Sequence, residues 1–161
     1  MASDYFIKLD GIDGDSYDKA HSKWIEVIEF NHGSMQNVAT GRVSDVAGRG
    51  QFKPFVFTHY VDKATPKLQQ YCMSGQKIAK AQFVTCRAIG GAQVPVYEIT
   101  LENVKILSCT IEGKDTTEGN ILPIEHVELV AGKITWKVTP IKPDNTKDGA
   151  VEASFNQLEN A

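Results

Sequence analysis

The acidic stretch from Leu9 to Val27, LDGIDGDSYDKAHSKWIEV, contains residue types that bind calcium. A helix-loop-helix calcium site needs oxygen ligands at positions 1, 3 and 5, Gly at position 6 and Glu at position 12. A start at Asp13 puts Asp18 where glycine is needed, and a start at Asp10 puts Ile12 at the second ligand position. Glycines beside Asp and Ser also form turns. A solvated turn is the better interpretation, with irregular calcium coordination as the alternative.

The remaining reactive residue types do not assemble into a catalytic motif. The sequence has no G-x-S-x-G elbow, and its histidines lack H-x-x-x-H spacing. GRGQF at 48–52 lacks the Lys-Ser/Thr of a phosphate loop. The glutamates of the expected strands are best explained as solvated or interface charges, and His32 and His59 as structural residues. These glutamates are Glu98, Glu102, Glu112, Glu125 and Glu128. We therefore expect that the protein is not an enzyme and that it binds no metal or cofactor.

Composition describes an ordinary folded domain. The chain has 161 residues, 42% hydrophobic and 23% charged, which predicts a single domain over 1–161. A net charge of −3 argues against nucleic-acid binding. No run of about 18 apolar residues predicts membrane insertion. The start lacks the pattern of a cleavable signal peptide. The three cysteines, Cys72, Cys86 and Cys109, are typical of synthesis in a reducing compartment.

Most of the chain has the two-residue periodicity of strands. Residues 94–112 change phase near Glu102–Asn103, which predicts a β-bulge. Ala131–Gly132 separates two further runs as a hairpin turn or a kink. Segments 37–51 and 113–120 are expected to be irregular. The expected strands cover 4–10, 24–32, 55–61, 77–89, 94–112, 122–130 and 133–140.

One segment, about 62–74, has helical periodicity. Asp62 or Thr65 can cap it, and Pro66 suits its first turn. Gly75 is placed to end it. A helix this short is expected to pack against the strands.

Five segments in this order resemble the Hcp family (haemolysin-coregulated proteins) of the bacterial type VI secretion system. The resemblance implies a mainly β fold, a β-barrel-like pair of packed antiparallel sheets with one short side helix. It also implies a homohexameric ring, rings stacked into a tube, a spike tip protein, a contractile sheath and effectors carried in the lumen. The chain would be made in the cytoplasm and secreted through this system. The segments are YFIKLDGIDGDSYDKAHSKWIEVIEF, FVFTHYVDKATPKLQQYCMSGQKIAKAQF, YEITLENVKILS, KITWKVTPIKPDN and FNQLEN.

The resemblance also assigns residues. It makes the acidic stretch a connection between two strands. It places Asn31, with Glu29 on the same face, on the lumen surface that contacts effectors. The family often has a small residue at this position, so cargo preference stays open. The extended loop 37–51 corresponds to the ring-stacking loop, where Arg42, Asp45 and Arg49 are candidate contacts. The alternative function is a soluble ligand-binding β-barrel without catalytic activity.

Overall fold

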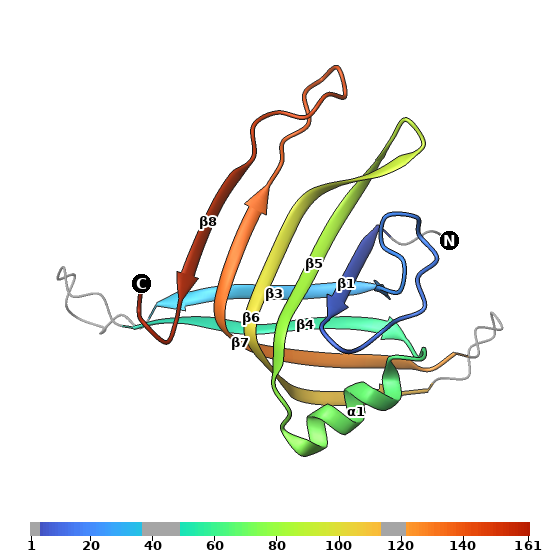
Figure 1. Ribbon diagram of the computed structural model, residues 1–161, viewed down its shortest axis with the longest axis vertical. Helices are drawn as coiled ribbons and strands as arrows, with labels where there is room; N and C mark the ends of the chain where they lie inside the picture. The colour runs from blue at the N-terminus through green and yellow to red at the C-terminus, as the bar shows by residue number, and fades with distance from the viewer. Residues whose placement is uncertain (1–3, 37–48, 114–121) are drawn as a thin grey trace.

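The computed structural model describes residues 4–36, 49–113 and 122–161, which contain eight strands and one helix (Figure 1). This content confirms the expected mainly β fold with a short side helix. The elements are β1 (Tyr5–Leu9), β2 (Ile25–Val27), β3 (Glu29–Gln36), β4 (Gly50–Tyr60), α1 (Thr65–Ser74), β5 (Ile78–Ile89), β6 (Ala92–Glu112), β7 (Ile124–Val138) and β8 (Val151–Asn156).

The strands form one continuous antiparallel sheet instead of two separate ones. Its order is β2-β1-β5-β6-β7-β4-β3, with β8 paired to β7. The end strands β2 and β3 follow each other in the chain, and Ile28 between them donates its N–H to the Thr58 carbonyl at 2.8 Å. Because only Ile28 joins the two end strands, the sheet has to curl so that its two ends come close together in space. Within the described ranges, no ladder joins β2 to β3, so the sheet is curled but not closed.

The prediction of one strand over 24–32 is wrong. The chain breaks at Ile28, where it leaves the pairing with β1 and enters the pairing with β4. The break changes which parity points inwards: Ile25 and Val27 are buried before it, and Phe30 packs on the core after it. Apolar residues of both parities in this segment thus serve one core.

The β6–β7 hairpin carries the predicted change of phase. Leu101 and Val104 are both buried, and Asn103 between them has φ +55°. The register shift in the pairing of β6 with β7 lies further along β6, between Ile106 and Ser108. Opposite Asn103, Gly132 lies within the single strand β7, so the predicted break there is a kink and not a hairpin turn. A Cβ on Gly132 would lie 3.3 Å from the Asn103 Cβ, which shows how closely the strands approach at this bend.

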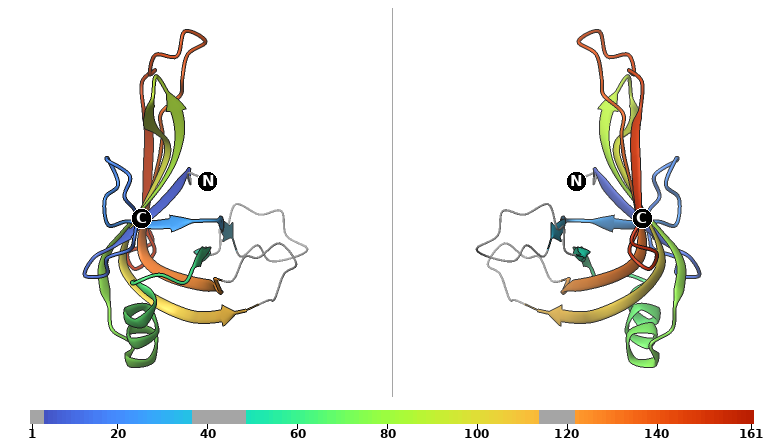
Figure 2. Two further views of the ribbon diagram at one scale, coloured as in Figure 1. Left: turned by 90° about the vertical axis from the view of Figure 1, so that its right-hand side faces the viewer. Right: turned by 90° about the vertical axis from the view of Figure 1, so that its left-hand side faces the viewer.

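Strands β5 to β8 continue beyond the curled part as a narrow extension (Figure 1), seen edge-on in Figure 2. The β5–β6 hairpin turns at Gly90 and Gly91, whose φ angles are +58° and +80°. Two positive φ angles in a two-residue turn match the twist of the flanking strands, and glycine adopts them without steric cost.

Aromatic rings fill the interior of the curled sheet. Phe83 of β5 lies between Phe30 and Phe55, with ring centroids 4.5 and 5.1 Å apart, respectively. Phe57 and Phe83 are at most 1% exposed. The interior is therefore a packed hydrophobic core.

Helix α1 covers one end of this core and begins three residues later than the expected range. The residue at the N-cap is Ala64, which makes no side-chain cap hydrogen bond, so the expected cap by Asp62 or Thr65 is wrong. These two residues bond within the preceding turn instead: the Asp62 carboxylate accepts the Ala64 N–H at 2.9 Å, and Thr65 Oγ1 accepts the Asp62 N–H at 3.2 Å. The helix ends at Gly75, whose φ of +68° is left-handed. Leu68 is fully buried, so the helix is held by packing. Among the described residues, no helix has the length and apolar character needed to cross a membrane.

Candidate functional site

The acidic stretch between β1 and β2 is organised by its own hydrogen bonds. Asp18 Oδ2 accepts the N–H groups of Ala20 and His21 at 3.1 and 3.0 Å and lies 2.8 Å from His21 Nδ1. The His21 ring stacks on Phe6 with centroids 4.6 Å apart. In the ranges the structure describes, no group of three or more His, Cys, Asp or Glu side chains is placed to hold a metal. Asp18 thus acts as a turn-forming residue.

The other histidines also lie in structural surroundings. His32 stacks on Phe55 with centroids 5.5 Å apart, and its Nε2 is 3.0 Å from the Tyr97 hydroxyl. Burial lowers the pKa of His32, which favours the neutral ring. His126 lies on the outer face, 3.7 Å from a carboxylate oxygen of Glu112. Of the described histidines, His21 lies in the β1–β2 connection and the others lie in three different strands, so they do not converge on one site.

Glu125 corrects the expectation that all strand glutamates are solvated or interface charges. It is 0% exposed, and its Oε1 lies 2.8 Å from His59 Nε2. Thr65 Oγ1 donates to Oε1 at 3.1 Å, and Gln69 Nε2 donates to Oε2 at 2.7 Å. These contacts attach helix α1 to β4 and β7. Because the pair is sealed from solvent, we interpret it as structural and not catalytic.

Two other glutamates behave as expected. Glu98 and Glu102 of β6 lie 3.7 and 3.6 Å from Lys137 and Lys133 of β7. All four side chains are substantially exposed, so these pairs contribute little to stability.

The predicted cargo residues Glu29 and Asn31 share the outer face of β3, where both are exposed. Phe30 between them points into the core. Asn31 pairs with Val56 of β4, which in turn pairs with Glu128 of β7. Paired residues on neighbouring strands point to the same side of a sheet. Glu29, Asn31 and Glu128 therefore form an acidic, polar patch that the sequence alone did not assemble.

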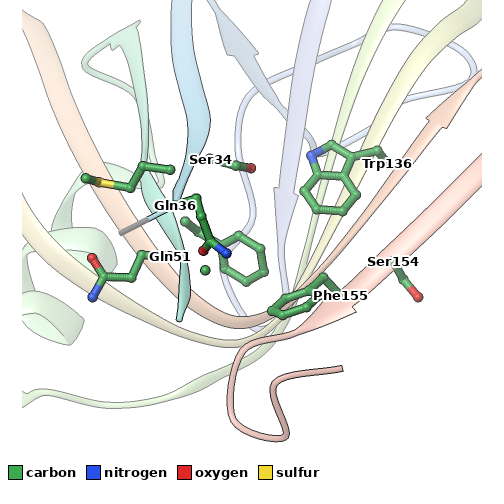
Figure 3. Close-up of a pocket in the computed structure, with 9 residues that line it drawn as sticks. Ser34, Gln36, Gln51, Trp136, Ser154 and Phe155 are labelled. Carbon is green, nitrogen blue, oxygen red and sulfur yellow. The ribbon is translucent and has the colours of Figure 1, made fainter. Parts of the chain in front are cut away.

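A groove of about 440 Å³ lies where β3 and β4 meet the β7–β8 hairpin (Figure 3). Figure 3 shows Trp136 and Phe155 facing the groove from β7 and β8, opposite Gln36 and Gln51. Phe52 packs edge-on against both aromatic rings, at 6.0 and 6.1 Å. The groove has an apolar floor and a polar rim, and it is lined by Ser34, Met35, Gln36, Gly50, Gln51, Phe52, Trp136, Ser154 and Phe155.

The face of the extension that contains Trp136 is apolar beyond the groove. Trp136 pairs with Ala153, and Val138 pairs with Val151, so these four side chains share that face. Val138 is 44% exposed and Val151 is 70% exposed. We call this surface, with Phe155 at its lower end, the apolar strip. An apolar surface of this kind is typical of an interaction site.

The expected stacking loop lies only partly within the described residues. Arg42 and Asp45 fall outside them. Arg49 is exposed, and its Nη2 donates to the Gln157 carbonyl at 3.5 Å. The predicted boundary at residue 51 is wrong because Gly50 and Gln51 already belong to β4, where they pair with β3.

The packed interior, the exposed patch and the apolar strip define a class of β-rich structural or binding domain. Residues 6–138 match the family model described as "Type VI secretion system effector, Hcp". The chain therefore belongs to the Hcp family, whose members are secreted structural tube proteins.

Individual relatives match between about three quarters and nearly all of the chain. Protein hcp1 of Pseudomonas aeruginosa is 32% identical over 162 residues, covering 99% of this chain and 98% of that protein. The "Major exported protein" of the same organism is 28% identical over 129 residues, covering 76% of this chain and 73% of that protein. The crystal structure of Hcp1 from Salmonella typhimurium has a TM-score of 0.81 at 28% identity, covering 99% of this chain and 98% of that one.

Proposed function

We propose that this chain is a tube subunit of a type VI secretion system. It forms hexameric rings, the rings stack into the inner tube, and the tube is exported with effectors in its lumen. The observation that carries this proposal is the family match over residues 6–138, together with a fold shared over 99% of the chain.

The apolar strip supports self-assembly. A strip that includes the exposed side chains of Val138 and Val151 needs a covering partner, and in a ring that partner is a second copy. The polar rim of the adjoining groove supplies hydrogen-bonding groups at the edge of such a contact. We assign the strip to the contact between neighbouring subunits.

The patch of Glu29, Asn31 and Glu128 is the proposed cargo surface. Its side chains lie on the side of the sheet that faces away from the core, so they can contact cargo without disturbing the packing. Its acidic character favours effectors that present basic or hydrogen-bonding groups.

Ring stacking is assigned to the loop that contains Arg42, Asp45 and Arg49. Removing part of 38–48 should leave hexamers intact because loop-closure entropy changes slowly with length. It should prevent tube assembly on the spike tip and inside the contractile sheath. Light scattering measures hexamers, and export from a complemented deletion strain measures tube function. Normal export by the shortened protein would exclude this role.

The alternative of a ligand-binding barrel requires an empty interior. Phe30, Phe55, Phe57 and Phe83 occupy that interior instead. The groove beside the apolar strip is open to solvent, and subunit association would cover it.

Native mass spectrometry tests the ring. The protein at micromolar concentration should give a particle of six times 17.7 kDa. Val151→Arg puts a charge on the apolar strip and should release monomers. Glu152→Gln, on the opposite face of the same strand, should keep the hexamer. A wild-type protein that is only monomeric at micromolar concentration would overturn the proposal. A Val151→Arg variant that remains hexameric would show that the apolar strip is not the subunit interface.

A further inference from the structure

Two cysteines that are 37 positions apart in the sequence come together where helix α1 crosses β6. The Cys72 side chain lies near enough to the Cys109 thiol to contribute, after burial and Glu125, to its raised pKa. It also donates to the Leu68 carbonyl at 3.7 Å, one helical turn before Cys72. Both cysteines are half-buried and pack against the core. The two thiols therefore lie close to each other where the helix packs on the strand.

We propose that Cys72 and Cys109 are a disulfide-forming site that is oxidised by small-molecule disulfides such as oxidised glutathione. One thiolate attacks a sulfur of glutathione disulfide, which breaks its S–S bond and releases one reduced glutathione. The second thiol then gives up its proton, its sulfur attacks the mixed disulfide, and the released second glutathione thiolate takes up that proton. In total the chain loses two protons and two electrons, and glutathione disulfide gains them.

The surroundings set the order of these steps. Burial, followed by the nearby Glu125 charge and the contact with Cys72, raises the pKa of Cys109 to about 12. Cys109 therefore stays a thiol near neutral pH, and exchange with external disulfides requires a thiolate. Cys72 is thus the attacking residue, and Cys109 is the resolving residue that closes the bond from within.

The step at which the cysteines become oxidised follows from the proposed function. An exported tube subunit passes from a reducing cytoplasm to oxidising surroundings, where disulfides persist. The bond would fix α1 to β6 and close a long loop between residues 72 and 109. Closure of such a loop restricts the unfolded chain and stabilises the fold. The exported protein would then be more stable than the same chain inside the cell.

Peptide mapping tests the site directly. The native protein is incubated in glutathione redox buffer, then denatured, alkylated and digested with trypsin without reduction. Cys72 lies in peptide 68–77, Cys109 in 106–114 and Cys86 in 81–87. We expect the first two peptides to be joined, with a loss of about 2 Da from the chain, while Cys86 is alkylated. The melting temperature should rise by about 10 °C and fall again with dithiothreitol.

Single substitutions separate the two roles. Cys109→Ser should trap a glutathione adduct on Cys72, whereas Cys72→Ser should leave Cys109 unmodified. Cys86→Ala should form the bond normally. Three alkylated cysteines in the treated wild type, or a lasting glutathione adduct on its Cys72, would overturn the proposal. Neither result bears on ring formation, because the mass of the particle is measured separately.

Discussion

His59 Nε2 lies 2.8 Å from the Glu125 carboxylate, and the two side chains are 1% and 0% exposed. The contact joins the end of β4 to the beginning of β7. Thr65 and Gln69 of helix α1 complete the hydrogen bonding of the same carboxylate. A single buried group thus fixes the helix to two strands of the sheet.

Replacing Glu125 with Ala should be strongly destabilising. It removes the acceptor of His59, Thr65 and Gln69 in a dry site, which we expect to cost about 3–5 kcal/mol of unfolding free energy. Glu102→Ala, which removes an exposed partner of Lys133, should cost less than about 1 kcal/mol. Urea unfolding monitored by circular dichroism measures both. Equal losses of unfolding free energy in the two variants would show that the buried Glu125 contacts stabilise the fold no more than the exposed ion pair.

His32 should make stability depend on pH. Burial lowers its pKa from the usual 6.5, so the folded chain binds fewer protons than the unfolded chain below that value. This contribution is complete above about pH 6.5 and is lost as the pH falls through the lowered pKa. In His32→Phe, the free energy of unfolding should fall less steeply between about pH 7.5 and 5.5. It should also be lower by about 1 kcal/mol at every pH, because the hydrogen bond with Tyr97 is lost. An unchanged slope in His32→Phe would contradict this role.

Gly14 should not tolerate a side chain. A Cβ there would lie 2.5 Å from the Trp24 carbonyl oxygen and 2.7 Å from backbone atoms of Ile25. Since backbone atoms cannot move aside as a side chain does, Gly14→Ala should lose about 1–3 kcal/mol. Gly149→Ala, where the added Cβ meets no described heavy atom within 4 Å, should stay within about 0.5 kcal/mol. Thermal melting of the two variants makes the comparison, and similar melting temperatures would refute the close approach.

Asn31→Arg should leave the ring intact and weaken cargo binding. Asn31 is exposed on the outer face of β3, so the new charge stays solvated. Co-purification of an effector from the same secretion system measures binding, and native mass measures the ring. Ser22→Arg, at an exposed position in the β1–β2 connection, serves as the control. Loss of hexamers in Asn31→Arg would instead place this residue in a subunit contact.

The sequence predicted those helices and strands whose signals come from residues close together in the chain. Alternation predicted most strands, and Gly75 predicted the end of the helix, whereas the start of the helix was predicted three residues too early. The break at Ile28 was missed because both halves of segment 24–32 alternate, and only the change of pairing partner separates them. The phase change at Asn103 was visible because apolar residues switch parity there.

Contacts between distant segments were not predictable in the same way. Glu125 looks like any solvated strand residue until α1 is packed over it. The contact of Cys72 with Cys109 and the groove floor of Phe52, Trp136 and Phe155 likewise depend on how strands from different parts of the chain curl together. Period-two patterns place a residue on a face of its strand, but they do not reveal what covers that face.

Electron microscopy of the purified protein tests the central claim most directly. We expect six-fold rings with an open channel, in which the outer face of β3 with Glu29 and Asn31 lines the channel and the apolar strip lies between neighbouring subunits. A reconstruction at side-chain resolution would show both surfaces at once. Particles without ring symmetry, or rings in which this face of β3 points away from the channel, would contradict the account.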